Sequence, residues 1–260
     1  MAADHESGLM ETDPLDQPVF TAQDVLAYRR GRGLLPDFAP PETVVVCYAR
    51  GLMTHAARRY RARRVGGFAA ELLLLEETAG RVAVAGNFGV GGPATAGVVE
   101  ELAALGARRF VIVGSAGGLQ PDLHPGDLLV AERAVRAEGV SRHYLPPAPD
   151  VAADPDLAEA LGRALNSHGL AYRSGVTWTT DAPYREIRRD VLRHQQAGVL
   201  AVEMEAASLF AVGRALGVAA GAVLVVFDIL SDGRWQLGQD LRPVEQSLRA
   251  ALEAVIACRH

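Results

Sequence analysis

Lysine is absent from this 260-residue sequence, in which all 26 basic residues are arginine. The absence excludes catalysis through a lysine Schiff base and phosphate binding by the lysine of a P-loop. The arginines remain available, and their planar guanidinium groups suit the recognition of phosphate and carboxylate groups.

Cysteine is scarce as well. Cys47 and Cys258 are the only two, and they lie too far apart for a disulfide scaffold or a cysteine metal site. His and Cys residues do not cluster anywhere in the sequence, so we expect neither a metal nor an organic cofactor. The net charge of −5 gives no general attraction to nucleic acid or to an anionic membrane, and we expect neither as a partner.

A long hydrophobic run is also missing. The longest apolar stretch, Val218 to Phe227, is far shorter than the roughly 20 residues that a membrane span requires. The acidic N-terminal segment lacks the apolar core of a signal peptide, so we expect a cytoplasmic protein. With 49% hydrophobic and 22% charged residues, the composition is that of a folded globular chain.

The pattern along the chain predicts one domain. Residues 1–20 are expected to form a flexible tail, and residues 21–260 a single catalytic domain whose first helix starts at Thr21 and Asp24. Apolar runs without polar alternation, typical of strands buried on both faces, alternate with helical patterns. We therefore expect an α/β fold in which helices flank a central mixed β-sheet in three layers. The expected strands are 43–46, 71–75, 81–85, 109–113, 127–135, 172–178, 199–202 and 219–227, and the expected helices are 52–64, 93–105, 154–167, 184–195, 204–216 and 244–257.

Two glycine-rich segments, residues 86–92 and 114–118, follow expected strands. Ligands of α/β sheets bind beyond the carboxyl ends of strands, and glycine N–H groups can form a nest for an anion. Tight turns explain either segment alone equally well. Neither segment matches a dinucleotide-binding fingerprint.

Acidic residues mark two further strand ends. Glu203 and Glu205 bracket Met204 where an expected buried strand meets an expected helix. The helix dipole favours acidic residues at such a position. A rigidly held carboxylate there could also bind both hydroxyls of a vicinal diol. Asp228 follows an apolar run, where burial would raise its pKa, whereas Asp232 lies beside a glycine in an expected solvated turn.

Together, the Glu-Met-Glu motif, the Gly-Ser-Ala-Gly-Gly segment at 114–118 and the glycine loop at 86–92 resemble the nucleoside phosphorylase family. That family includes purine nucleoside phosphorylases, uridine phosphorylases and methylthioadenosine/S-adenosylhomocysteine nucleosidases. The resemblance covers the chain from about Thr43 to its end. It implies a nucleoside and inorganic phosphate as substrates and a homo-oligomer, either a dimer or a hexamer.

The resemblance also implies roles for individual residues. Glu205 would bind the ribose 2′- and 3′-hydroxyls, and Met204 would lie under the sugar. Ser115 and Gly114 would bind phosphate. In purine-acting members the acid that protonates the leaving base lies 23 positions after the second glutamate, and 205 + 23 = 228. The resemblance therefore makes Asp228 a catalytic residue together with Glu205.

The identity of the base is less sharply indicated. Tyr184 and Phe227 are expected to contact the base together with Asp228. Asp228 favours a purine, and our main prediction is phosphorolysis of a purine nucleoside. The segment Asp181 to Tyr184 instead resembles uridine phosphorylases, which makes uridine the alternative.

The phosphate arginines of the family are missing from their usual places, which Met53 and Ile112 occupy. Arg50, just after the first expected strand, is the nearest substitute, and the arginines between positions 58 and 64 could serve across a subunit interface. Loss of these arginines favours a hydrolytic N-ribosyl nucleosidase, but the acid that such an enzyme needs after the first strand is also missing. A nucleoside-binding protein without turnover is a third possibility, disfavoured by the retention of Ser115, Glu205 and Asp228.

Overall fold

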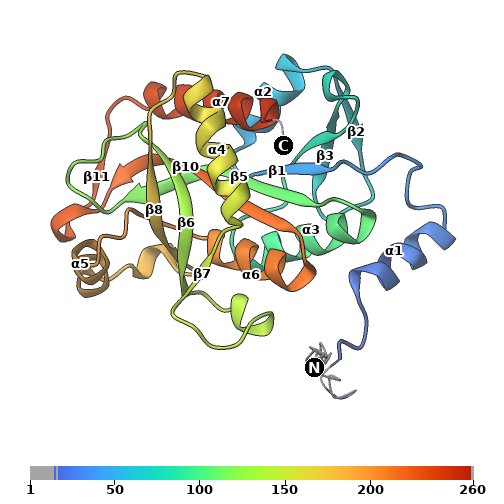
Figure 1. Ribbon diagram of the computed structural model, residues 1–260, viewed down its shortest axis with the longest axis horizontal. Helices are drawn as coiled ribbons and strands as arrows, with labels where there is room; N and C mark the ends of the chain where they lie inside the picture. Colours follow the sequence, from blue (N-terminus) through green and yellow to red (C-terminus); the bar gives the residue numbers. More distant parts are fainter. Residues whose placement is uncertain (1–14, 16, 259–260) are drawn as a thin grey trace, which may run out of the picture.

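The computed structural model describes residue 15 and residues 17–258. The chain alternates between strands and helices (Figure 1). The helices are α1 (Ala22–Gly31), α2 (Arg50–Arg59), α3 (Gly92–Leu105), α4 (Pro155–Ser167), α5 (Arg188–Gln196), α6 (Ala206–Leu216) and α7 (Arg242–Ala257). The strands are β1 (Thr43–Cys47), β2 (Ala62–Val65), β3 (Glu71–Leu75), β4 (Val82–Gly86), β5 (Arg109–Gly118), β6 (Leu128–Ala137), β7 (Asp150–Ala152), β8 (Tyr172–Thr180), β9 (Ala201–Glu203), β10 (Ala219–Ile229) and β11 (Gln236–Leu237).

The strands form one mixed sheet, part of which closes on itself. β1 lies between β4 and β5 and is parallel to both, while β3 and β2 extend that side in antiparallel fashion. β10 pairs with both β5 and β6, and β8 and β9 connect β6 back to β5. The strands β5, β10, β6, β8 and β9 therefore form a closed ring, in which every strand has a partner on each side.

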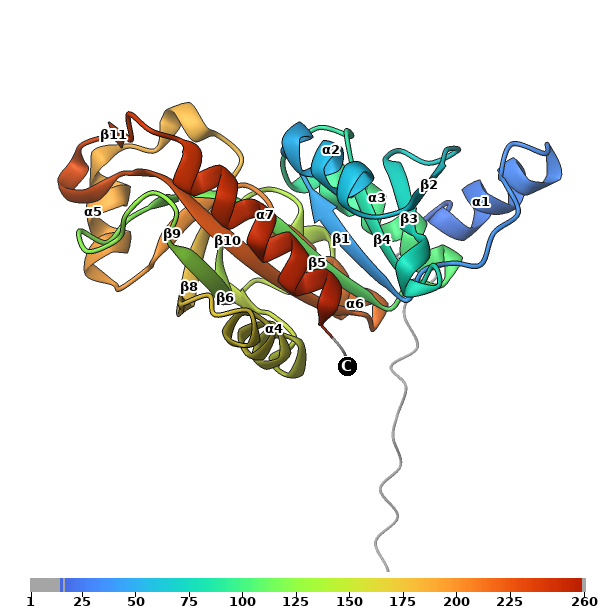
Figure 2. The same ribbon diagram turned by 90° about the horizontal axis from the view of Figure 1, so that it is seen from above.

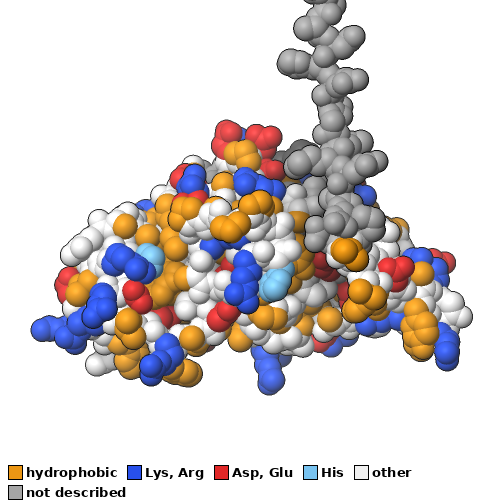
Figure 3. All heavy atoms as spheres, turned by 90° about the horizontal axis from the view of Figure 1, so that it is seen from below, with side chains coloured by type: hydrophobic (Ala, Val, Ile, Leu, Met, Phe, Trp, Pro, Cys, Tyr) orange, Lys and Arg blue, Asp and Glu red, His pale blue; other side chains and the backbone are white. Residues whose placement is uncertain are grey.

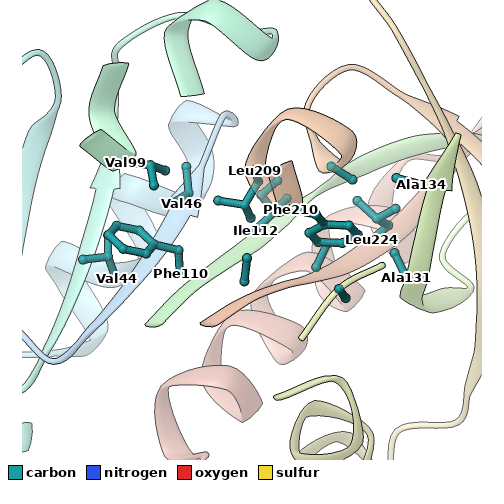
Figure 4. Packing of buried hydrophobic residues seen from close by; sticks show 14 of the residues in the cluster. Val44, Val46, Val99, Phe110, Ile112, Ala131, Ala134, Leu209, Phe210 and Leu224 are labelled. Atoms are coloured by element: carbon teal, nitrogen blue, oxygen red, sulfur yellow. The ribbon is translucent and has the colours of Figure 1, made fainter. Parts of the chain in front are cut away.

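Helices cover both faces of the sheet, with α2, α4 and α7 on one face and α3 and α6 on the other (Figures 1 and 2). β1 shows why the sequence demands both layers. Val44 and Val46 pack with the α3–α6 layer (Figure 4), whereas Val45 and Cys47 pack with the α2–α7 layer, and all four are fully buried. Burial of consecutive residues on opposite faces confirms the predicted α/β fold with a mixed central sheet.

The first helix begins as its sequence predicts. The Thr21 hydroxyl accepts a hydrogen bond from the Asp24 N–H, and the Asp24 carboxylate accepts one from the Thr21 N–H. This reciprocal capping box leads into α1, which packs against α3. The predicted tail lies largely outside the described residues, since positions 1–14 and 16 are not described, and the domain boundary at residue 21 stays a prediction.

Three expectations about elements are wrong. The helix expected over residues 184–195 begins only at Arg188, after the short turn Pro183–Arg185. The helix expected to reach Arg64 ends at Arg59, and residues 62–65 form the edge strand β2, where Arg64 pairs with Glu71 of β3. The segment 114–118 is not a loop but the second half of β5. Glycine is needed within that strand because a Cβ on Gly117 would lie 2.4 Å from the Leu230 side chain and 3.1 Å from the Asp228 carboxylate.

Among the described residues, none of the helices combines the length and apolar character required to cross a membrane. Over the same residues, no three His, Cys, Asp or Glu side chains are grouped so that they could hold a metal ion. Arginine side chains on the face shown in Figure 3 are spread among acidic and apolar groups and do not gather into one basic patch.

Candidate active site

A cavity of about 660 Å³ opens where β5, β9 and β10 end. Its lining combines acidic, aromatic and small residues: Tyr48, Val90, Ser115, Ala116, Gly117, Pro183, Tyr184, Glu186, Val202, Glu203, Met204, Glu205, Phe227, Asp228, Leu230 and Trp235. Six of the predicted site residues are thus brought together from four separate parts of the chain. Such a concave pocket with a few convergent polar groups is the expected form of a small-molecule site.

Glu203 fixes the backbone at the start of α6. One carboxylate oxygen accepts hydrogen bonds from the N–H groups of Glu205 (2.7 Å) and Ala206 (2.6 Å), and the other accepts the Thr179 hydroxyl at 2.5 Å. The side chain is buried, and both of its oxygens accept hydrogen bonds from the protein. Glu203 therefore holds the start of α6 and positions its neighbour Glu205.

Glu205 is held by the glycine loop. Its Oε1 accepts a hydrogen bond from the Gly91 N–H at 2.6 Å, and the residue is only 7% exposed. Burial, and secondarily the charge of Glu203, raises the pKa of Glu205 to about 7. The anion that this N–H of the loop binds is thus the protein's own carboxylate, which also lines the cavity.

Asp228 and Phe227 enter the cavity together because β10 has a bulge. The pairing of β10 with β5 shifts register between Val226 and Asp228, which leaves Phe227 as an extra residue. Consecutive residues of a regular strand point to opposite faces, and a bulge of this kind re-aims one side chain toward the face of its neighbour. The sequence predicted both contacts but contained no sign of the bulge that allows them.

Two further groups lie at the Asp228 end of the cavity. The Trp235 indole N–H donates a hydrogen bond of 2.7 Å to Asp228 Oδ2. Burial raises the pKa of Asp228, and the indole N–H opposes that rise. Glu186, in the turn that precedes α5, has its pKa raised to about 7 by burial and then by the charge of Asp228. This end therefore holds two carboxyl groups that interact with each other.

The predicted phosphate residues are only partly assembled. Ser115 is exposed on the cavity wall, and Gly114 precedes it in β5. Arg50 begins α2 as an exposed residue outside the cavity lining, and its assignment to phosphate stays a prediction. Ile112 and Met53, at the usual arginine positions, are buried in the two halves of the hydrophobic core, where a guanidinium group would be desolvated.

The remaining predicted residues take clear positions. Met204 lies between the two glutamates, and Tyr184 stands at the rim with 99% of its surface exposed. Asp232 lies outside the cavity lining, and its Oδ1 accepts a weak hydrogen bond from the Gln195 side chain.

Sequence reasoning missed three polar residues of the site, Tyr48, Glu186 and Trp235. Tyr48 directly follows β1, and its hydroxyl pairs with Thr95 at 2.7 Å. The position of Tyr48 at a strand end could have identified it from the sequence. Glu186 and Trp235 lie in connecting segments, where no sequence pattern marks them as site residues.

The chain matches the Phosphorylase superfamily over residues 53–257. It belongs to that superfamily. A solved uridine phosphorylase from Vibrio fischeri ES114 has the same fold, with a TM-score of 0.72 at 24% identity over 84% of this chain and 92% of the other. The predicted family resemblance is therefore confirmed.

Curated relatives align over shorter stretches. A uridine phosphorylase of Thermococcus kodakarensis is 40% identical over 152 residues, 54% of this chain and 55% of that protein. The uridine phosphorylase of Escherichia coli is 36% identical over 161 residues, 56% of this chain and 64% of that protein. A guanosine phosphorylase of Halorubrum lacusprofundi is 36% identical over 182 residues, 65% of this chain and 73% of that protein. The chain thus spans between about half and two thirds of the length of the first two of these relatives.

Proposed function

We propose that this protein is a nucleoside phosphorylase, and that uridine is its substrate, cleaved by phosphate to uracil and ribose 1-phosphate. The observation that carries the proposal is the shared cavity that joins Ser115, Glu205 and Asp228. The several relatives named uridine phosphorylase favour uridine over the purine nucleoside that the sequence predicts. A guanosine substrate is the second candidate, supported by the relative named guanosine phosphorylase and by the position of Asp228.

The proposed chemistry separates charge along the cavity. Cleavage of the N-glycosidic bond builds positive charge on the ribose and negative charge on the base. Ionised Glu205 accepts the two ribose hydroxyls and stabilises the cationic sugar. The carboxyl groups at the opposite end, Asp228 and Glu186, are placed to meet the departing base, and phosphate attacks from the side of Ser115.

Phosphate binding is the least complete part of this site. None of the cavity-lining residues in the described part of the chain is an arginine. Phosphate carries two negative charges that a serine hydroxyl and backbone N–H groups balance only in part. We therefore propose that an arginine completes the site, either Arg50 of the same chain or an arginine of a second copy in a homo-oligomer.

A base-release assay tests the proposed function. Uridine, guanosine, adenosine and cytidine are each incubated with the protein, with and without phosphate, and free base and ribose 1-phosphate are measured. We expect uracil release that requires phosphate and yields an equal amount of ribose 1-phosphate. Release without phosphate would indicate the hydrolytic alternative, and faster release of guanine would select the purine nucleoside as substrate.

The expected homo-oligomer can be tested together with the source of the phosphate-binding arginine. We expect light scattering to show a dimer or a hexamer, and an Arg50→Ala variant to separate the two sources of the arginine. If Arg50 binds phosphate, the variant raises the KM for phosphate about tenfold or more, as loss of a charge-assisted hydrogen bond of about 1.5–3 kcal/mol requires. An active monomer with an unchanged phosphate KM in Arg50→Ala would contradict both sources.

A further inference from the structure

Glu186 is a carboxyl group that the family motifs did not identify. It follows the short turn η4 (Pro183–Arg185), which connects β8 to α5, and it lines the cavity together with Asp228. The side chain is half-buried, and in the described part of the chain it makes no hydrogen bond or ion pair. An acid in such a place has lost water without gaining a partner, so its neutral form is favoured.

Asp228 differs from Glu186 in having a hydrogen-bond donor, although burial raises its pKa as well. Its Oδ2 accepts the indole N–H of Trp235 at 2.7 Å, a hydrogen bond that stabilises the charged carboxylate. Because the two carboxyl groups interact, a negative charge on Asp228 makes a second charge on Glu186 unfavourable. When two carboxyl groups compete for one proton, the group that accepts no hydrogen bond retains it. Here that group is Glu186, since the Trp235 indole N–H stabilises the carboxylate of Asp228.

Other charged groups near Glu186 and Asp228 do not change which of the two carboxyl groups keeps the proton. Arg185 and Arg188 flank Glu186 in sequence, yet neither forms an ion pair with it among the described residues, and the Arg188 side chain lies against Gly233. The carboxylate of Asp232, in the turn η5 (Ser231–Gly233), lies outside the cavity and accepts a hydrogen bond of 3.4 Å from the Gln195 side chain. The remaining ionisable groups that line the cavity are Tyr48, Tyr184, Glu203 and Glu205.

We propose that Glu186 is the acid that protonates the departing base, and that Asp228, held as a carboxylate by Trp235, keeps the proton on Glu186. This assignment rests on the proposed function and adds a catalytic residue to it. It also changes the role that the sequence suggested for Asp228, from proton donor to the charge that retains the proton on its neighbour.

The proton balance is complete. The C1′–N bond breaks and its electron pair goes to the base, which takes the proton of the Glu186 carboxyl group and leaves as a neutral molecule. Phosphate supplies the electron pair of the new C1′–O bond and later loses its own proton to water. Glu186, left as a carboxylate, takes a proton from water, so one turnover restores the enzyme.

Glu186→Gln tests the proposal by comparing two leaving groups. With uridine or guanosine, whichever the wild type cleaves, we expect a fall in kcat of about 10²-fold or more, the usual range for a lost general acid. With 4-nitrophenyl β-D-ribofuranoside, whose leaving group departs without a proton, we expect kcat within a few-fold of wild type. Equal losses with both substrates would overturn the assignment and reduce Glu186 to a binding or structural residue.

The pH profile supplies a second measurement. The wild type should lose activity as the pH rises through the pKa of Glu186, about 7, because the proton needed by the base is lost. Glu186→Gln should lack that alkaline decline, while Glu245→Gln, at an exposed glutamate of α7, should keep it. An unchanged decline in Glu186→Gln would overturn the proposal.

Infrared titration of the protein without substrate separates this proposal from the proposed function. Near pH 6 the wild type should show one more protonated carboxyl band than Glu186→Gln. A missing band would overturn the protonation of Glu186 even if the enzyme is active. A present band in a protein that cleaves no nucleoside would overturn the proposed function and, with it, proton delivery to a base.

Discussion

Glu205→Gln is expected to lower kcat/KM for the nucleoside by about 10²-fold or more, the scale of losing one strong contact made in the transition state. The neutral amide can still accept the Gly91 N–H, so the fold around the loop should be retained. It cannot supply the negative charge that stabilises a cationic ribose, nor accept two hydroxyl groups with its second atom, which is a donor.

Steady-state kinetics across pH check this prediction. Because Glu205 must be ionised and Glu186 must be protonated, and both pKa values are about 7, the wild-type profile should be a narrow bell, and Glu205→Gln should lose its acidic limb. Phosphate ionisation contributes equally to both proteins. Glu132→Gln on β6, outside the cavity, serves as the matched control and should behave as wild type. Near-normal turnover in a folded Glu205→Gln protein would remove the ribose assignment.

Asp228→Asn is expected to lower kcat by up to about tenfold at neutral pH, because burial rather than the charge of Asp228 is the main cause of the raised Glu186 pKa, whereas Asp232→Asn should leave kcat close to the wild-type value. The amide oxygen introduced by Asp228→Asn can still accept the Trp235 indole N–H, but the amide carries no charge to hold the proton on Glu186. The pKa of Glu186 should then fall, and lowering the pH should restore part of the lost activity.

Asp232 is a suitable control because it is a nearby aspartate that does not line the cavity. It lies four residues further along the same segment, outside the cavity, and its φ of 54° is one that asparagine also adopts readily. Side-by-side kinetics of the two variants check the ranking. A larger loss in Asp232→Asn would mean that the site uses the other aspartate.

The fold was predictable where burial leaves few choices. β1, with four consecutive fully buried residues, and α1, with its capping box, follow from local sequence alone. β2 was missed because Arg63 and Arg64 lie on an exposed edge, where no apolar period distinguishes a strand from a helix. The length of β5 was missed because glycines that allow close strand packing look like loop glycines in a sequence.

The site was predictable where one motif carries both position and chemistry. Glu203 and Glu205 share a strand–helix junction, which places the second carboxylate without knowledge of the rest of the fold. Glu186 and Trp235 acquire their roles only through Asp228, a residue 42 positions from one and seven from the other (228 − 186 and 235 − 228). Local sequence contains no record of such contacts.

The closed ring of strands has a consequence for how base preference can diverge within this superfamily. Ser115, Glu203 and Asp228 all sit on ring strands, where a change of backbone would disturb two neighbouring strands at once. Glu186 and Trp235 belong to connections outside the ring, and such connections tolerate substitution at small cost in stability. Under the proposed function, substitution can therefore replace Glu186 and Trp235 at the base end of the cavity while the ring strands that carry Ser115 and Asp228 stay unchanged; relatives named uridine phosphorylase and guanosine phosphorylase both align with this chain.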